Sequence, residues 1–142
     1  MRLDELQAAF LRVKLPKLHG WNDRRRSAAS RYDELLGGLG DIQIPTIASG
    51  ATHVYHLYVI QTSRRDDLAA WLHKKGVFTL VHYPRCIHEH RAYSELEGLK
   101  GAFPVAERLA RTSLSLPMHP HLTESEQVYV AECIAAFFSG QA

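Results

Sequence analysis

Gly76-Val-Phe-Thr-Leu-Val-His-Tyr-Pro84 is the stretch of this 142-residue chain that indicates the fold most clearly. Its β-branched and aromatic residues predict a buried strand, because such side chains pack well on a pleated surface. Gly76 is suited to end a preceding helix, since glycine adopts the left-handed C-cap conformation without a steric penalty. Pro84 lacks the amide proton that a strand ladder needs. The strand therefore delivers His82 and Tyr83, two proton-handling side chains, to its end.

Helices and two further short strands are predicted on both sides of this segment. Residues of high β-propensity indicate strands at 53–60, 77–83 and 113–116. Apolar residues at helical spacing indicate helices at 2–18, 21–39, 63–75, 104–111 and 123–138. Capping boxes are expected to open two of these helices, with Ser63 and Asp66 in one and Thr123 and Glu126 in the other. Three strands separated by helices predict an α/β fold, in which a three-stranded sheet is flanked by helices and follows a long N-terminal helix.

The N-terminal helix carries apolar side chains on two of its faces. One face has Leu3, Leu6, Phe10 and Val13, and the second has Leu11, Leu15 and Leu18. Two apolar faces are more than the outer helix of a small domain needs to bury. We expect no N-terminal cap, because the first residue already lies nearly in the helix, as if the helix were cut at its start. We therefore expect both faces to be unpaired in the isolated chain.

Composition and charge exclude several classes of function. The chain has 46% hydrophobic and 23% charged residues and a net charge of +2, so electrostatics predict no nucleic-acid or membrane partner. The residues of Arg24-Arg25-Arg26 point in successive directions around a helix and make no single basic face. No apolar run is long enough to span a membrane, and no signal peptide is recognisable. Cys86 and Cys133 lie in no paired motif, which predicts a reduced, cytoplasmic protein.

Histidine and cysteine side chains offer two alternative chemistries. His-x-His pairs occur at 88/90 and 119/121, and in extended backbone each pair could chelate a metal. The chain has no His-Glu-x-x-His motif, no cysteine pair and no carboxylate at a matched spacing, so we interpret these residues as loop histidines and predict no metal site. Cys86 with His88 would make a nucleophile only if a base were oriented, and no catalytic-cysteine signature is present.

Neither a phosphate-binding loop nor a catalytic lysine is predicted. The glycines between positions 37 and 40 end a helix and do not open one. The five lysines occupy positions 14, 17, 74, 75 and 100. None has the desolvated setting that lowers the pKa of a Schiff-base amine.

Five segments, in the same order, resemble the C-terminal part of the DegT/DnrJ/StrS family. These are pyridoxal-phosphate-dependent aminotransferases that act on keto sugars attached to nucleotides. The likeness is greatest to the transaminases that make 3-amino-3,6-dideoxyhexoses on dTDP, and it covers essentially the whole chain. The segments are Arg2-Leu-Asp-Glu-Leu-Gln-Ala-Ala, His53-Val-Tyr-His-Leu-Tyr-Val-Ile, Gly76-Val-Phe-Thr-Leu-Val-His-Tyr-Pro, Phe103-Pro-Val-Ala-Glu-Arg-Leu and Leu114-Ser-Leu-Pro-Met-His-Pro-His-Leu-Thr.

The resemblance implies an aspartate-aminotransferase-like fold, of fold type I. Residues 1–40 would form a long helical segment between domains, and residues 41–142 the small C-terminal domain. The family further implies a homodimer and a nucleotide-sugar substrate, in the biosynthesis of amino sugars.

The resemblance also implies roles for individual residues. His82 and Tyr83 match the family's His-Tyr pair near the sugar-nucleotide pocket, where they would bond the sugar and assist proton transfer. His88 matches a histidine that borders the same pocket. Arg2 matches the motif Asn-x-Arg-x-Asp-Glu-x-Gln, close to the cofactor, and the asparagine of that motif would precede Met1.

The departures from the family pattern limit what the chain is expected to do alone. In the family, the Schiff-base lysine and the cofactor-binding Asp and Ser lie in a large domain, so we expect this chain neither to bind pyridoxal phosphate nor to be catalytic by itself. A large domain or an intact aminotransferase subunit would then be its partner. Alternatively, the chain is a remnant that acts as a binding, regulatory or interaction domain. Arg85 and Cys86 replace the proline and apolar residues usual after His-Tyr-Pro, which bears on substrate preference.

Overall fold

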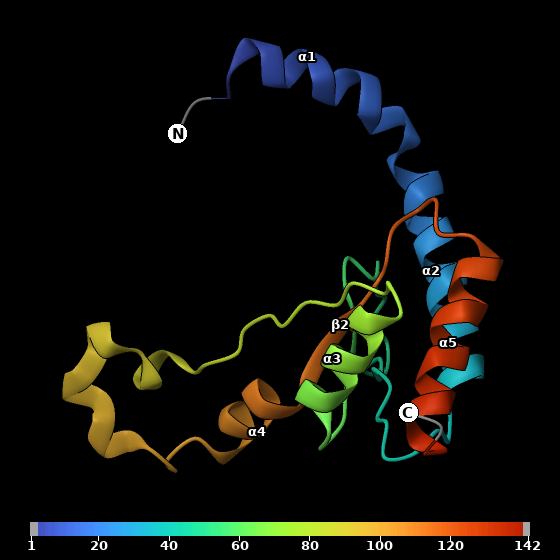
Figure 1. The fold of residues 1–142 in the computed structure, drawn as a ribbon. Helices are drawn as coiled ribbons and strands as arrows, with labels where there is room; N and C mark the ends of the chain where they lie inside the picture. Colours follow the sequence, from blue (N-terminus) through green and yellow to red (C-terminus); the bar gives the residue numbers. More distant parts are fainter. Residues whose placement is uncertain (1–2, 141–142) are drawn as a thin grey trace.

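The computed structural model describes residues 3–140, except for the side chains of residues 94 and 96–98. Helices α2 and α5 lie side by side, and α3 and the sheet pack on them (Figure 1). Helix α1 and the arm of residues 84–103 project away from this body (Figure 1). The elements are α1 (Glu5–Lys14), η1 (Leu15–Lys17), α2 (Leu18–Leu36), β1 (Tyr58–Gln61), α3 (Arg65–Lys74), η2 (Ile87–Glu89), η3 (Arg91–Leu99), α4 (Pro104–Thr112), β2 (Ser113–Leu116) and α5 (Glu124–Phe138).

The sheet of the described residues has two strands, so the prediction of three strands was wrong. Strands β1 and β2 pair antiparallel, with Tyr58 opposite Leu116 and Gln61 opposite Ser113. The segment 77–83 adds only one bridge, between Leu80 and Ser115, at the other edge of β2. The expected strand at 53–60 is also shorter, because Tyr55 has a positive φ of 49° and the strand begins only at Tyr58.

Pro117 and Ser113, on either side of Ser115, explain why the segment 77–83 does not form a longer strand. In the register that Leu80 and Ser115 set, the next bonded pair on one side would join Phe78 to Pro117, which has no N–H to donate. On the other side, the carbonyl oxygen of Ser113 accepts a hydrogen bond from Arg65 instead. The segment is also not buried as predicted, since Phe78 is 71% exposed.

The hydrophobic core lies between the sheet and helices α2, α3 and α5. The phenol of Tyr58 donates a hydrogen bond to Asp33 Oδ1 at 2.6 Å, and that of Tyr32 donates to the carbonyl of Pro117 at 3.1 Å. Burial raises the pKa of both phenols, which therefore stay neutral. The largest fully buried apolar residues at the centre of this core are Tyr32, Leu36, Tyr58, Ile60, Leu68, Leu72, Leu114 and Ile134.

The helix ends confirm some of the expected caps and correct others. Thr123 and Glu126 form the predicted capping box of α5. Ser63 does not cap α3, because its N–H and hydroxyl both donate to Asp41. Burial raises the pKa of Asp41, but the hydrogen bonds from Ser63 and Thr62 outweigh it and the net pKa is lowered. A polar partner 22 residues earlier in the chain therefore displaces the local cap.

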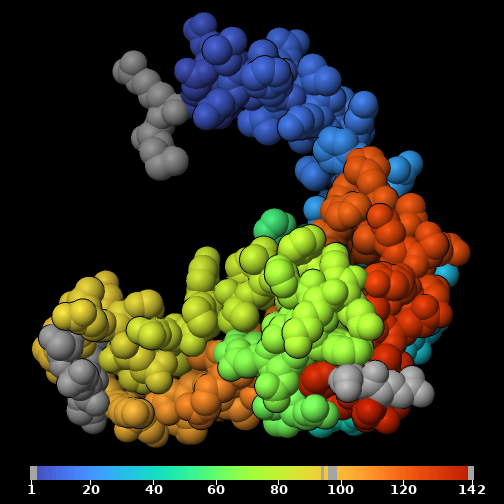
Figure 2. Space-filling view, viewed as in Figure 1, coloured from blue at the N-terminus to red at the C-terminus, as the bar shows by residue number. Residues whose placement is uncertain are grey.

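Helix α1 makes no packed contact with the body and has no buried residue. The two apolar faces are exposed as predicted, with Leu6 71%, Phe10 66% and Leu11 53% accessible, and α1 stands clear of the body (Figure 2). The expectation of an uncapped start was wrong, because the carboxylate of Asp4 accepts hydrogen bonds from the N–H groups of Leu6 and Gln7. Within residues 3–140, no helix is both long and apolar enough to cross a membrane.

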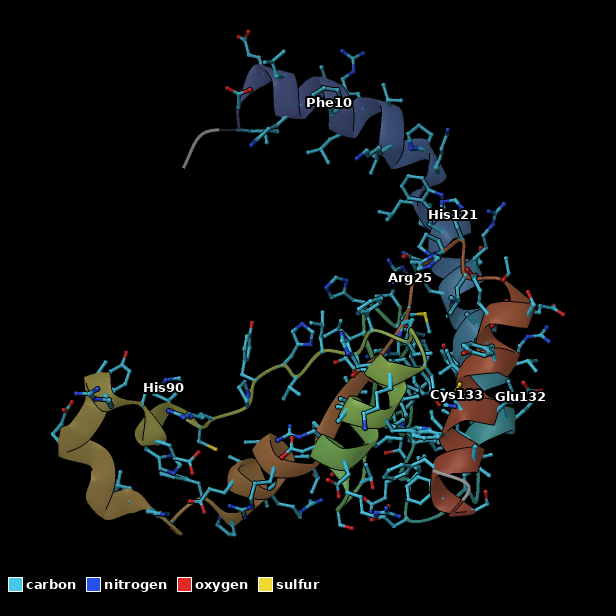
Figure 3. All side chains as sticks on the ribbon, viewed as in Figure 1. Phe10, Arg25, His90, His121, Glu132 and Cys133 are labelled. Carbon is cyan, nitrogen blue, oxygen red and sulfur yellow. The ribbon has the colours of Figure 1, made fainter. Side chains whose placement is uncertain are left out.

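Arg25 connects α2 to two loops that carry no regular structure. Its Nη1 donates to the carbonyl oxygens of Tyr55, His56 and Met118, at 3.2, 3.3 and 3.2 Å (Figure 3). The sequence predicted only that Arg24-Arg25-Arg26 make no single basic face. The structure gives the middle residue, Arg25, a structural role, because its guanidinium donates to three backbone carbonyl groups.

Replacing Arg25 with methionine is expected to destabilise the fold, because three carbonyl groups lose a charged donor. We expect the free energy of unfolding in urea to fall by about 1–3 kcal/mol. The matched control is Arg24→Met, since Arg24 is exposed on the same helix and should change stability by less than about 0.5 kcal/mol. Equal unfolding curves for the two variants would contradict the role given to Arg25.

Candidate functional site

The three residues predicted to bind substrate line one cavity. His82, Tyr83 and His88 lie around a hollow of ≈ 550 Å³ where the arm leaves the body. The opposite wall comes from Phe103 and from residues of α4. Residues that precede η3 and residues that follow it therefore line the same cavity. The sequence alone predicted only that His88 borders the pocket of His82 and Tyr83.

His82 is held by the sheet edge from which it extends. Its Nδ1 lies 3.0 Å from the hydroxyl of Ser115, a buried residue whose backbone bridges Leu80. Tyr83 follows as a residue that is 75% exposed, with its ring edge-on to the imidazole at 5.9 Å between centroids. The imidazole of His82 is therefore fixed by Ser115, while the phenol of Tyr83 remains free to contact a ligand.

His88 is buried and paired with a carboxylate that the sequence reasoning missed. Its Nε2 lies 3.2 Å from Oε1 of Glu107, and its ring packs 5.2 Å from that of Phe103. The same Glu107 oxygen accepts the N–H of Gly101 at 2.7 Å. That N–H is the largest cause of the lowered pKa of Glu107, and His88 adds to it. In the sequence, Glu107 looked like an ordinary acid in the first turn of a helix.

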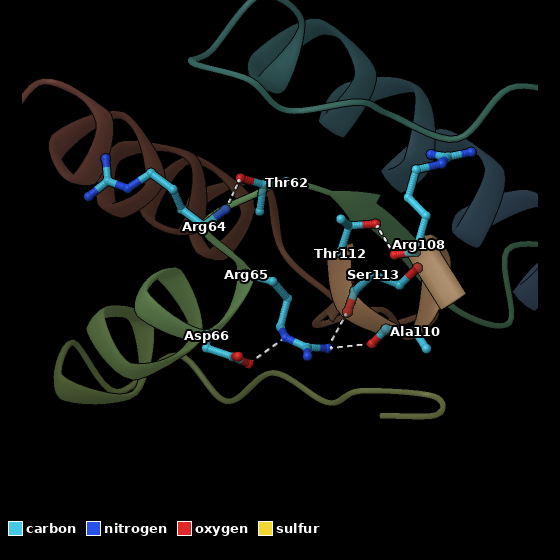
Figure 4. A network of polar contacts seen from close by, with 8 residues as sticks. All are labelled: Thr62, Arg64, Arg65, Asp66, Arg108, Ala110, Thr112 and Ser113. Carbon is cyan, nitrogen blue, oxygen red and sulfur yellow. Dashed lines mark hydrogen bonds and ion pairs between the residues drawn. The ribbon is translucent and has the colours of Figure 1, made fainter. Parts of the chain in front are cut away.

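Arg65, the first residue of helix α3, binds the backbone that lines one side of the cavity. Its Nη1 donates to the carbonyl oxygens of Ala110 and Ser113, at 3.2 and 3.3 Å (Figure 4). Both residues line the cavity at the junction of α4 and β2. Arg65 also pairs with Asp66, so its buried guanidinium is charge-compensated.

The alternative chemistries find no support among the described residues. Partial burial and the nearby Glu89 and Glu107 raise the pKa of Cys86, which keeps its thiol protonated and unsuited to attack. Among the side chains that the structure describes, no three of His, Cys, Asp or Glu gather into a metal site. His90 lies on the arm and is exposed (Figure 3).

The lysines and Arg2 do not complete this site. All five lysines are exposed, and none lines the cavity. Lys75 lies over the ring of Trp71, at 4.4 Å from its centroid. Arg2, predicted to lie near a cofactor, falls outside the described residues.

A second hollow lies between α2 and α5. It measures ≈ 450 Å³ and is lined by Arg31 and Glu124, which form an ion pair with each other. Asp23 in its wall is paired with Arg26. Arg24 also lines it, so most but not all of the lining charges are compensated within the described residues.

Comparisons with known proteins agree on one family. A family model described as the DegT/DnrJ/EryC1/StrS aminotransferase family matches residues 1–135. The "Pleiotropic regulatory protein" of Geobacillus stearothermophilus is 43% identical over 139 residues, covering 96% of this chain and 37% of its own length. The dTDP-3-amino-3,4,6-trideoxy-alpha-D-glucose transaminase of Streptomyces venezuelae is 41% identical over 133 residues, covering 94% of this chain and 35% of its own.

A solved structure is similar over the same extent. The crystal structure of S. venezuelae DesV superposes with a TM-score of 0.91 at 40% identity, covering 96% of this chain and 37% of that one. The chain therefore spans little more than a third of the length of the proteins it matches.

The lowered pKa of Glu107 predicts a stability contribution that depends on pH. Because the folded pKa lies below the ordinary value of 4.5, the contribution is complete above pH 4.5 and is lost as the pH falls through the folded pKa. Glu107→Gln removes this contribution. When the pH is lowered from 5, the unfolding free energy of the variant should therefore fall less than that of the parent protein. The exposed Glu132→Gln should follow the parent curve. Parallel curves for all three proteins would refute the argument.

Proposed function

Because the chain belongs to the DegT/DnrJ/EryC1/StrS aminotransferase family, we propose that it is the sugar-binding part of a pyridoxal-phosphate-dependent transaminase acting on a nucleotide-linked keto-deoxysugar. The resemblance predicted from the sequence is confirmed at the level of the family. The observation that carries the proposal is the cavity in which His82, Tyr83 and His88 meet. Imidazole and phenol groups bond hydroxyl groups in both directions and handle protons, which suits a sugar and its transamination.

The cofactor is proposed to be held by residues outside this chain. Pyridoxal phosphate supplies the electron sink for transamination and needs a lysine to carry it. The described residues do not fit that requirement, since every lysine is exposed and away from the cavity. Arg2 is proposed to lie beside the cofactor of the assembled enzyme. On this proposal the chain has no transaminase activity by itself.

Two residues that depart from the family pattern stand at the cavity. Arg85 and Cys86 both line its wall. No hydrogen bond or ion pair within the described residues engages the guanidinium of Arg85, so it is available to an anionic group. We propose that Arg85 meets the phosphates of the nucleotide or an acidic substituent of the sugar.

Helix α1 is proposed to bind the part of the enzyme that this chain does not contain. Ten-residue helices are only marginally stable without packing, and α1 has none. Its two exposed apolar faces would be a liability unless they are covered. We propose that residues 1–40 link the missing large domain to the small domain of residues 41–142, and that the assembled enzyme is a homodimer.

Association through α1 can be tested with a complementary polypeptide. We expect the chain to copurify with the S. venezuelae transaminase from which the matching 133 residues are removed, and to restore transamination of a dTDP-linked keto sugar. Phe10→Asp should weaken this association at least tenfold, because it puts a charge on an apolar face. The matched control is Arg12→Asp, two residues further on and on the opposite side of the helix. Equal affinities for both variants would exclude that face of α1 from the interface.

The cavity residues can be tested in the same reconstituted enzyme. His82→Ala and Tyr83→Phe should each reduce turnover of the nucleotide sugar, by about tenfold or more for His82, while association and bound cofactor are unchanged. Tyr93→Phe is the control, because Tyr93 lies on the arm and does not line the cavity. Unchanged kinetics for both cavity variants would remove them from the site.

A second candidate is a binding or regulatory domain without catalysis. The observation in its favour is that none of the lysines is positioned for the chemistry. This candidate predicts that the chain binds a nucleotide sugar in calorimetry while no complementary polypeptide restores turnover.

A further inference from the structure

The pair of His88 and Glu107 is a built feature of the cavity wall. The two side chains are each 7% exposed and join η2 to the first turn of α4 across 19 residues of sequence. Burying an imidazole and a carboxylate together is costly unless each satisfies the other. Glu107 is further held by the N–H of Gly101, so its position does not depend on His88 alone.

The chemistry of the pair fixes which nitrogen of His88 carries a proton. Glu107 has a lowered pKa, and an ionised carboxylate only accepts hydrogen bonds. The hydrogen bond at 3.2 Å therefore requires the proton on Nε2 of His88. In a neutral imidazole the other nitrogen, Nδ1, is then a free acceptor.

Nδ1 of His88 is the ring nitrogen that Glu107 does not engage. No hydrogen bond between His88 Nδ1 and another described side chain or backbone group is found. His88 itself lines the cavity, together with His82 and Tyr83.

We propose that Glu107 is a positioning residue: it holds His88 with the proton on Nε2, so that the imidazole presents Nδ1 to the cavity as an acceptor for a hydroxyl group of the sugar. The sugar contact rests on the proposed function, whereas the positioning of His88 does not. In His82 the other ring nitrogen is engaged. Ser115 contacts Nδ1 of His82, so Nε2 is the nitrogen that remains for a ligand. The two histidines then offer different ring edges to one ligand.

The tautomer of His88 can be measured directly in the chain. Nitrogen-15 spectra of the imidazoles, recorded above neutral pH and assigned with His88→Gln, should show His88 as the Nε2-protonated form. Glu107→Gln should keep that form, because the amide oxygen still accepts the proton. Glu107→Ala should shift the signals toward a mixture of tautomers, and the exposed Glu95→Gln should leave them unchanged. A His88 protonated on Nδ1 in the parent chain would overturn the proposal, even if Glu107→Ala failed to fold.

Kinetics of the reconstituted enzyme separate this inference from the proposed function. Glu107→Ala should raise KM for the nucleotide sugar several-fold and leave KM for the amino donor unchanged. A raised KM for both substrates, or for neither, would overturn the sugar contact. An enzyme that turns over while His88 is Nδ1-protonated refutes the positioning and keeps the function. The expected tautomer without any turnover refutes the function and keeps the positioning.

Discussion

The single backbone bridge between Leu80 and Ser115 sets the place of the cavity. Ser115 lies opposite Val59 on one side and exchanges two hydrogen bonds with Leu80 on the other, at 2.8 and 3.2 Å. Its side chain then reaches the imidazole of His82. The buried Ser115 thus connects the sheet, the segment 77–83 and the site residue His82. Because Pro117 and the Arg65-bound carbonyl of Ser113 prevent further pairing, the chain leaves the sheet directly after this bridge and opens the cavity.

The molecule has a packed body and two projecting parts, helix α1 and the arm of residues 84–103. The body buries apolar side chains, and the projecting parts leave most of theirs exposed. The body has a closed core in which buried polar groups are paired, for example Trp71 with the carbonyl of Cys133 and Gln127 with that of Ala28. Helix α1 has capping groups but no buried side chain, so local hydrogen bonds alone hold its shape. The arm is tied back mainly through His88 and Glu107. Both projecting parts leave large apolar side chains exposed, among them Phe10 on α1 and Ile87 on the arm.

Local patterns predicted local structure well and failed where a distant residue intervened. Gly76, with a φ of 76°, ends α3 as expected, and Thr123 caps α5. Ser63 looked equally suited to cap a helix, but Asp41 takes both of its donors. The segment 77–83 has the composition of a strand, but Pro117 and the Arg65-bound carbonyl of Ser113 limit it to one bridge. Sequence periodicity contains no information about such partners.

The sequence by itself determined the family and the approximate positions of the main helices, and it predicted that His82, Tyr83 and His88 belong to one site, because motifs and periodicity are properties of consecutive residues. Only the tertiary structure decided what holds the two histidines and the cavity wall. Ser115, Glu107 and Arg65 lie 33, 19 and 45 or more residues from the groups that they bind, and nothing in their local sequence marks them. Their roles follow from burial, since a polar group removed from water must find a partner wherever the fold brings one within reach.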